Sequence, residues 1–581
     1  MNKEQEIIIN DLYGKISVVA GPGSGKTKTL IERVKEIINK NVCNQNEILL
    51  ITFTNKVRME IKDRLKSEIG INDVKIHTFH SFAIEIIKKY FKSINLNENL
   101  KIIEKEEIKF LLEESYFQLL YDGEKEIIDS FDFDELVDSE IFSIKKARNS
   151  KEKILLKMFE IIKQEKGYST FDDLIFNLIE ILKTDVALNI VENIKFLMVD
   201  ECQDLNEEQY SVIDLLIKNN LQNVLLVGDL DQSIYSWRGA KPDLFKQFYL
   251  HSKKYKLKSN YRSCKEIVLS SKKLILNNKD RINLGSLITN KNKGSVEIFE
   301  HNNREEQAKN VVLQIKELMK DNKKIAVLFR AEYLMHDIIN YFYKEGLFFN
   351  KISDNEFYSK REVKDILSLL KLLNDSDDIL SWRDLINRFN ILDYNDLINL
   401  KSNEKNYFKN LTNYIKNKND FDEKTQNYIN FILSFQDIQN DKTMNYLEKI
   451  VFIIKKYQFK QLLWKNDSFL INNINNLLYQ LDVFISEGNS LDDFLLNLGT
   501  FNIKNNALID LMTIHSSKGL EFDYVFILDV NQDILPHKKN LDLSEERRLM
   551  YVAMTRAKDK LFINCVLNEK TRKSIFIEEI K

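Results

Sequence analysis

Residues 20–27, with the sequence AGPGSGKT, have the types and spacing of a loop that binds phosphate groups. Glycines allow backbone N–H groups to point at phosphate oxygens, and a helix that begins after them adds a favourable partial charge. In such a loop Lys26 reaches the β- and γ-phosphates and the Thr27 hydroxyl ligates Mg²⁺. The segment predicts a site for a nucleoside triphosphate and Mg²⁺ at Ala20, Gly21, Pro22, Gly23, Ser24, Gly25, Lys26 and Thr27.

An acidic pair follows a second apolar run, in the segment FLMVDECQD at 196–204. Asp200, at the end of this expected strand, is placed to hold Mg²⁺ through water, and Glu201 to orient or deprotonate an attacking water. Taken alone, the pair fits a solvated turn equally well. Together with the phosphate loop it favours hydrolysis of the nucleotide by water.

These residues need a scaffold of strands and helices. Residues 16–20 (ISVVA) fit a buried strand, and the apolar residues that follow the loop recur at helical spacing. Alternating strands and helices predict parallel sheets in α/β domains. Few strand signals occur at about 90–180 and 380–500, which we interpret as helical insertions within two α/β cores. The further strands are predicted at 48–53, 196–200, 224–228, 325–329, 508–513 and 524–528.

Length and composition exclude several classes of protein. A chain of 581 residues corresponds to about three or four domains at roughly 100–200 residues each. Hydrophobic residues at 44% and charged residues at 30% indicate a globular protein. The formal charge of −2 does not indicate nucleic acid, although a basic groove can be offset by acidic surface elsewhere.

Cysteine usage and hydropathy indicate a reduced, cytoplasmic protein without a membrane partner. The four cysteines lack the spacing of zinc ligands, and the N-terminal residues do not resemble a signal peptide. No apolar run approaches the roughly 20 residues that span a bilayer. The cysteines are Cys43, Cys202, Cys264 and Cys565.

Residues 227–240 (VGDLDQSIYSWRGA), with DECQD upstream, resemble the third helicase motif of the UvrD/Rep/PcrA family. These are superfamily 1A DNA helicases that move 3′ to 5′ on DNA. The family's other motifs are resembled, in order, by LLITFTNKVRMEI (49–61), HTFHSFA (77–83), LKSNYRS (257–263), FYSKREVKD (357–365), LMTIHSSKGLEFDYVFIL (511–528) and EERRLMYVAMTRAKDKL (545–561).

The resemblance implies an α/β fold with two RecA-like P-loop motor domains, 1A and 2A, each with a mainly helical insertion, 1B and 2B. ATP is expected between 1A and 2A. The implied bounds are 1–88 and 181–262 for 1A, 89–180 for 1B, 263–378 and 499–581 for 2A, and 379–498 for 2B.

The resemblance also implies roles at the ATP site. Gln5 reads adenine, Tyr261 stacks on the base and Glu521 binds the ribose hydroxyls. Lys28 stands where several relatives carry an arginine that packs on adenine, so stacking is weaker there. The residues expected to carry the hydrolysis are Lys26, Asp200, Glu201, Gln232 as the γ-phosphate sensor, and Arg262 and Arg556 as γ-phosphate ligands.

A track for single-stranded DNA is expected beside the nucleotide. Aromatic platforms and a basic groove bind single strands without sequence preference. Phe53, Tyr235 and Trp237 match positions where the family stacks bases. The expected contacts with DNA and its phosphates are Arg238, His515, Thr52, Thr78 and His80.

The leading interpretation is an ATP-dependent 3′–5′ DNA helicase and translocase that acts on single-stranded and on 3′-tailed or forked duplex DNA. Two alternatives stay open. One is a motor or sensor subunit of a larger complex with a separate nuclease and little unwinding of its own. The other is a non-catalytic nucleotide-binding scaffold. Because the last motif ends at residue 561, we expect no appended nuclease domain.

Overall fold

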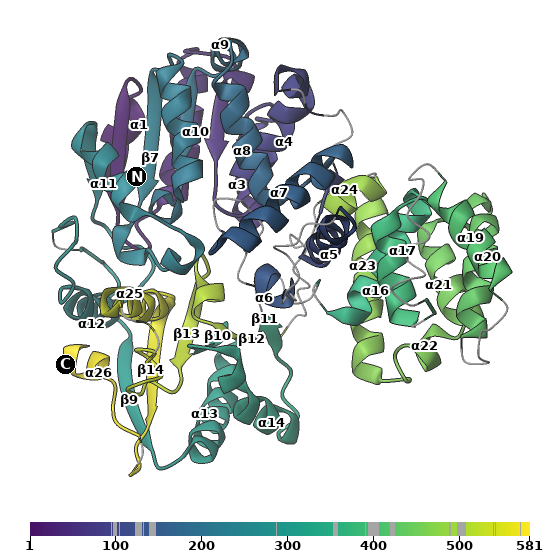
Figure 1. Ribbon diagram of the computed structural model, residues 1–581. Helices are drawn as coiled ribbons and strands as arrows, with labels where there is room; N and C mark the ends of the chain where they lie inside the picture. Colours follow the sequence, from purple (N-terminus) through teal and green to yellow (C-terminus); the bar gives the residue numbers. More distant parts are fainter. Residues whose placement is uncertain are drawn as a thin grey trace. The chain divides into compact units, whose positions relative to one another are not determined.

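The computed structural model forms two compact units, residues 1–352 with 505–581 and residues 353–504 (Figure 1). It describes all residues except 95, 97–100, 104, 123–130, 132, 139–146, 286, 353–357, 359, 390, 393–405, 419–424, 487–489, 497–506, 539, 541, 570 and 581.

The first unit contains two six-stranded parallel sheets. The first has the order β3-β2-β6-β7-β1-β8. Its central strands are almost continuously buried, as expected for parallel strands covered on both faces. The six strands of this sheet are β1 Lys15–Ala20, β2 Ile48–Ile51, β3 Lys75–His77, β6 Phe196–Val199, β7 Asn223–Gly228 and β8 Lys253–Leu257.

Helices cover both faces of this sheet and bury two apolar layers. One layer includes the apolar face of α2, and the other includes those of α4, α8 and α10. The helices around the sheet are α1 Lys3–Asn10, α2 Lys26–Asn39, α3 Asn55–Ile69, α4 Phe79–Tyr90, α8 Phe171–Leu182, α9 Val186–Glu192, α10 Glu207–Lys218 and α11 Pro242–Leu250.

The second sheet has the order β11-β12-β10-β13-β14-β9, again with parallel pairing throughout. Its strands are β9 Ser295–His301, β10 Ile325–Phe329, β11 Asn350–Ile352, β12 Ile509–Thr513, β13 Phe522–Ile527 and β14 Ala557–Val566. The helices with it are α12 Lys265–Ile275, α13 Arg304–Leu318, α14 His336–Lys344, α25 Leu543–Met554 and α26 Ile575–Ile580.

All seven predicted strands are present, with ends within two residues of the predicted ones. The prediction omitted β3, β8, β9, β11 and β14. Several of these omitted strands lie at sheet edges, where one side is open and polar residues are tolerated. The sequence KKYKL of β8, for example, has few apolar residues because only part of the strand is buried.

The region predicted as insertion 1B contains helices and one short pair of strands. These are β4 Lys101–Ile102, α5 Lys105–Tyr121, α6 Phe133–Asp138, α7 Ser150–Glu165 and β5 Tyr168–Ser169. Most of helix α8 also falls within the predicted range 89–180, but this helix packs in the core of the first sheet with α4 and α10. The domain boundaries stay predictions.

The second unit is helical over its described residues. Its apolar core is rich in aromatic rings, including Trp382 stacked on Phe408 with ring centroids 5.3 Å apart. The range predicted for insertion 2B, 379–498, lies inside this unit. Helix α16, which falls in the range predicted for 2A, lies inside it as well. The helices are α16 Arg361–Asn374, α17 Ile379–Phe389, α19 Tyr407–Asn417, α20 Gln426–Asn440, α21 Tyr446–Lys456, α22 Phe459–Leu462, α23 Ser468–Ser486 and α24 Leu491–Leu496.

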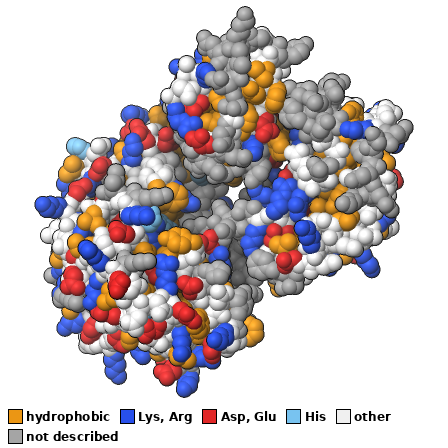
Figure 2. All heavy atoms as spheres, turned by 60° about the horizontal axis from the view of Figure 1, so that its bottom comes forward, with side chains coloured by type: hydrophobic (Ala, Val, Ile, Leu, Met, Phe, Trp, Pro, Cys, Tyr) orange, Lys and Arg blue, Asp and Glu red, His pale blue; other side chains and the backbone are white. Residues whose placement is uncertain are grey.

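The visible surface carries mixed charge. On the face shown in Figure 2, Lys and Arg side chains are interspersed with Asp and Glu, in agreement with the formal charge of −2. No helix among the described residues combines the length and the apolar character needed to cross a membrane.

Candidate functional site

The phosphate loop connects the end of β1 at Ala20 to the start of α2 at Lys26. Gly23 and Gly25 have φ values of 63° and 81°, in the left-handed region that glycine adopts without strain. A Cβ atom at Gly23 would lie only 2.6 Å from Cβ of Arg262, and the N–H of Tyr261 donates to the Gly23 carbonyl at 2.8 Å. The loop and the segment 257–263 are therefore in direct contact.

Lys26 lies beside the acidic pair that follows β6. Its Nζ is 3.3 Å from Oε2 of Glu201. Burial lowers the pKa of Lys26, but the carboxylates of Glu201, Asp229 and Asp200 raise it more, so the ammonium stays charged. Glu201 has φ 53° and ψ 42°, a left-handed conformation that is strained for a residue with a side chain. Such strain is typical of functional sites.

The pair Asp200 and Thr27 fits the requirements of Mg²⁺. Burial and then the charge of Glu201 raise the pKa of Asp200, whose carboxylate is also hydrogen-bonded with Thr27. A divalent cation stabilises a buried carboxylate of this kind. Mg²⁺ sites use one or two carboxylates together with substrate phosphates.

Arg556, on the segment that follows α25, reaches the same site from the second sheet. Its guanidinium donates to Oε1 of Gln232 at 2.8 Å and to the carbonyls of Val552 and Leu520 at 3.0 and 3.2 Å. Only 1% of the residue is exposed, and burial lowers the pKa of Arg556 to about 9. None of its hydrogen-bond acceptors in the described chain is a carboxylate. A buried positive charge with neutral partners favours an anionic ligand such as phosphate.

The residues expected around the base and ribose also lie together. Nε of Arg262 is 2.9 Å from Oε2 of Glu521, and Nζ of Lys558 is 2.9 Å from the other oxygen of the same carboxylate. Gln5 is buried, with its amide Nε2 donating to the Ser24 carbonyl at 3.3 Å. Tyr261 is 51% exposed and free to stack on a ring. Lys28 is exposed at the start of α2.

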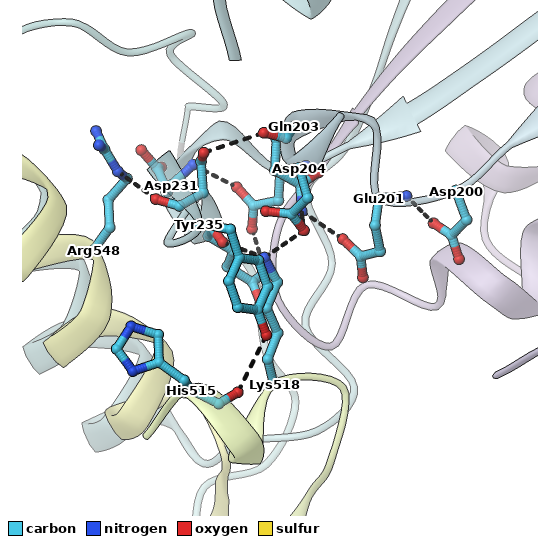
Figure 3. A network of polar contacts seen from close by, with 12 residues as sticks. Asp200, Glu201, Gln203, Asp204, Asp231, Tyr235, His515, Lys518 and Arg548 are labelled. Carbon is cyan, nitrogen blue, oxygen red and sulfur yellow. Dashed lines mark hydrogen bonds and ion pairs between the residues drawn. The ribbon is translucent and has the colours of Figure 1, made fainter. Parts of the chain in front are cut away.

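Three residues without a predicted role join the two sheets (Figure 3). Gln203 donates from Nε2 to Glu201 at 2.6 Å and to Asp204 at 3.2 Å. Lys518 donates to Asp204 at 2.5 Å and to the backbone carbonyl of Gln232 at 2.6 Å. Their only signal in the sequence was their position inside the two segments DECQD and HSSKGLEF.

Aromatic residues form a continuous group next to Gln232. The rings of Phe53 and Tyr235 stack with centroids 5.6 Å apart and planes 17° apart. Trp237 is 63% exposed, and its centroid lies 6.4 Å from that of Tyr235 and 6.1 Å from that of His515. The guanidinium of Arg238 lies 4.6 Å from the Trp237 centroid. This arrangement combines exposed stacking area with positive charge, as single-stranded nucleic acid requires.

Nucleotide-site and aromatic residues are connected through Lys518. Its Nζ lies 4.9 Å from the Tyr235 ring centroid while it contacts the Gln232 carbonyl. The Tyr235 hydroxyl donates to the His515 carbonyl at 3.4 Å. Gln232 and the aromatic group therefore share Lys518 as a common neighbour.

Helix α25 holds the same turn from the second sheet. Oε1 of Glu545 accepts from the N–H of Ser236 at 3.0 Å, and Nε of Arg548 donates to the Ser233 carbonyl at 2.7 Å. The sequence indicated neither contact, because the partners are more than 300 positions apart.

Three predicted DNA ligands have local partners in the structure. The Thr52 hydroxyl donates to the Thr54 carbonyl at 3.1 Å, and the Thr78 hydroxyl caps α4 by accepting from the Ser81 N–H at 3.2 Å. The His80 and Phe171 rings lie almost perpendicular, with centroids 5.9 Å and planes 83° apart. Their contact with DNA phosphates stays a prediction.

Comparisons with known proteins agree with this geometry. Residues 1–253 match the UvrD/REP helicase N-terminal domain, and residues 255–568 match the UvrD-like helicase C-terminal domain. The chain is 31% identical to the ATP-dependent DNA helicase Rep of Buchnera aphidicola subsp. Schizaphis graminum, over 97% of this chain and 92% of that protein. It is 29% identical to the ATP-dependent DNA helicase PcrA of Staphylococcus epidermidis, over 97% of this chain and 83% of that protein. This chain therefore belongs to the UvrD/REP helicase family.

Proposed function

We propose that this protein is an ATP-dependent DNA helicase that moves 3′ to 5′ along single-stranded DNA and separates 3′-tailed or forked duplexes. One observation carries the proposal above the others. The side chain of Gln232 contacts the buried Arg556. The backbone carbonyl of Gln232 contacts Lys518, whose ammonium lies over the ring of Tyr235. One residue thus joins a site suited to phosphate with a group suited to bases.

Hydrolysis of ATP uses the residues around Lys26. Lys26 and Arg556 stabilise negative charge on the transferred phosphate, and Glu201 orients the attacking water. Burial raises the pKa of Glu201, but Lys26 and Lys518 lower it more, so this carboxylate is ionised and accepts a hydrogen bond from the attacking water. Thr27 and Asp200 would hold Mg²⁺, which neutralises phosphate charge when bound.

Translocation follows from differential contacts in the two nucleotide states. Arg262 is paired with Glu521, so γ-phosphate has to compete for this guanidinium. Because Arg262 already lies against the phosphate loop, its turn to the γ-phosphate releases Glu521. The γ-phosphate also attracts Arg556, which precedes β14, and so draws the second sheet toward the first. The accompanying shift of Gln232 changes the position of Tyr235 and Trp237 against the DNA bases.

The finer assignments belong to the same proposal. The two sheets correspond to motor domains 1A and 2A, with insertions 1B and 2B as bounded from the sequence. Gln5 and Tyr261 bind adenine, and Glu521 binds ribose after release from Arg262. We place the protein in the cytoplasm. The alternative of a motor subunit with a separate nuclease finds no support in the comparisons.

Two assays test the proposal. ATP hydrolysis is measured with and without single-stranded DNA, and strand separation is measured on 3′-tailed and 5′-tailed duplexes. We expect DNA-stimulated hydrolysis and unwinding of the 3′-tailed substrate only. Lys26→Ala serves as control, with hydrolysis abolished and single-strand binding retained. Hydrolysis without unwinding of either substrate contradicts the helicase assignment.

A further inference from the structure

Arg33 is a buried charged residue with no part in the chemistry described above. It lies on α2, seven positions after Lys26, and is 2% exposed. A buried guanidinium is costly unless its hydrogen bonds are met. Burial lowers the pKa of Arg33 to about 10, so it remains charged at neutral pH. A residue of this kind has to be held by specific partners.

The partners of Arg33 are carbonyl groups of the last turn of helix α1 and of the two residues that follow it. Nη1 donates to the carbonyls of Ile8 and Asp11, and Nη2 donates to that of Leu12 at 2.9 Å. The last carbonyls of a helix have no partner within the helix and carry partial negative charge. Helix α1 has no basic residue in its own last turn. Arg33 supplies from α2 the cation that α1 lacks.

The other end of α1 is also fixed. Asn2 and Gln5 form a capping box, in which the N–H of Gln5 donates to Oδ1 of Asn2 and the N–H of Asn2 donates to Oε1 of Gln5. Nδ2 of Asn2 donates to Oγ of Ser259 at 2.9 Å. Because an eight-residue helix is marginal by itself, these contacts act together with the burial of Ile8 to fix where α1 lies.

Gln5 stands against the phosphate loop as a result. Its amide Nε2 donates to the Ser24 carbonyl, and a Cβ atom at Gly25 would lie 2.9 Å from this nitrogen. Two turns of one rigid helix separate Lys26 from Arg33, a rise of about 10 Å. Arg33 therefore fixes the helix that carries Gln5 to the helix that carries Lys26.

We propose that Arg33 is a positioning residue that gives the nucleotide site its preference for adenine, by holding Gln5 at a fixed distance from the phosphate loop. The inference rests on the proposed function, in which Gln5 reads adenine. Arg33 itself contacts neither the base nor the phosphates. Its loss allows α1 to move, so contacts to the base weaken while contacts to the triphosphate persist.

The test compares the binding and hydrolysis of ATP and of inosine triphosphate, which shares the phosphates and ribose but has an oxo group in place of the 6-amino group. In Arg33→Met we expect the preference for ATP, as a ratio of dissociation constants and of KM values, to fall by about 2- to 10-fold, the effect of one lost hydrogen bond. We expect kcat to change by less than about twofold. Gln5→Ala should lower the preference equally, and the double variant should lower it no further.

Control variants separate positioning from stability. Arg547→Met removes another buried arginine, whose partners are Glu579 and Asn278. It should lower the melting temperature without changing the preference for ATP. If Arg33→Met does not fold, Arg33→Lys and Asn2→Ala, which loosens the opposite end of α1, replace it and should each reduce the preference.

The outcomes are distinct. A normal preference in the Arg33 and Asn2 variants, with a reduced preference in Gln5→Ala, overturns the inference. A normal preference in Gln5→Ala overturns it as well and removes Gln5 from the adenine site. Binding that favours ATP without DNA-stimulated hydrolysis contradicts the proposed function instead, and the binding ratios still decide the role of Arg33.

Discussion

At the scale of single residues, the site contains charged groups whose burial costs free energy. It also contains groups whose interactions are completed only when a ligand binds. Lys26 balances the carboxylates of Glu201, Asp200 and Asp229. Arg556 is buried with neutral partners, and Trp237 leaves 63% of its surface in solvent. Such groups lower the stability of the folded protein. Their presence together in one site is explained by the binding of phosphates and bases.

Trp237→Ala tests the stacking role. We expect single-stranded DNA to bind more weakly by about 1–3 kcal/mol, the contribution of one aromatic platform, with ATP hydrolysis in the absence of DNA unchanged. Fluorescence anisotropy of a labelled oligonucleotide measures the affinity. Phe348→Ala is the matched control because Phe348 is an exposed aromatic, at 86%, outside the track. Equal affinities of the two variants would remove Trp237 from the track.

His515 predicts a dependence of stability on pH. Burial, and then the charges of Arg330, Arg238 and Lys518, lower the pKa of His515 to about 4, although Glu546 acts in the opposite direction. Between about pH 6.5 and 4 the unfolded chain binds this proton and the folded protein does not, so stability falls as pH falls. We therefore compare the free energy of unfolding of His515→Asn with that of the wild type. The difference should favour the variant by about 1–2 kcal/mol more at pH 4.5 than at pH 7.5.

Urea unfolding at the two pH values measures this difference. Comparison with the wild type cancels the contributions of the other titrating groups. A difference that does not change with pH would show that His515 titrates normally in the folded protein.

At the scale of elements, the turn that contains Gln232 is held by segments of the second sheet. The turn runs through η6 Leu230–Gln232 and η7 Ser236–Arg238. Residues of α25 contact Ser233 and Ser236, and Tyr235 contacts the first residue of η10 His515–Ser517. Lys518 follows η10 and closes the connection through Asp204 and the Gln232 carbonyl. The two sheets are thus coupled through one short turn.

Lys518→Met tests this coupling. Removal of the ammonium leaves Asp204 buried without its ion pair, and stability should fall by about 1–3 kcal/mol. Asp204→Asn in the same chain should recover part of the loss, since the buried charge is then absent. We expect single-strand binding to persist and the stimulation of ATP hydrolysis by DNA to fall by about tenfold or more. Thermal unfolding and ATPase assays measure the two effects, and undiminished stimulation would contradict the coupling.

At the scale of the whole molecule, the attraction of DNA has to come from a local track. Charges of both signs alternate over the visible surface, and the formal charge is −2 (Figure 2). Long-range steering is therefore weak, and affinity depends on local cations near Trp237, such as Arg238.

Salt titration of single-strand binding tests this view. With about three to five phosphates neutralised, affinity should fall by about 10- to 100-fold between about 50 and 200 mM salt. In Arg238→Gln the slope of log affinity against log salt should become shallower by about 0.7, the value for one phosphate on a single strand. An unchanged slope in that variant would exclude Arg238 from phosphate contact.

The sequence alone determined the features that depend on near neighbours in the chain. Residue type and short-range periodicity encode the loop at 20–27, the seven predicted strands and the acidic pair after β6. Family motifs added the predicted roles of Gln232, Arg262, Glu521 and Arg556. Edge strands such as β8 were not predicted, because the sequence shows no apolar run where a strand is buried only in part by its neighbours in the sheet.

Only the tertiary structure decided which of these residues meet. Arg262 pairs with Glu521 across 259 positions of the chain, and Lys518 reaches the Gln232 carbonyl across 286. Arg33 faces the end of α1 because two helices pack, not because of any pattern around either. Such pairs are set by the order of strands in the sheets and by the burial of charge, which act between segments and leave no local periodicity.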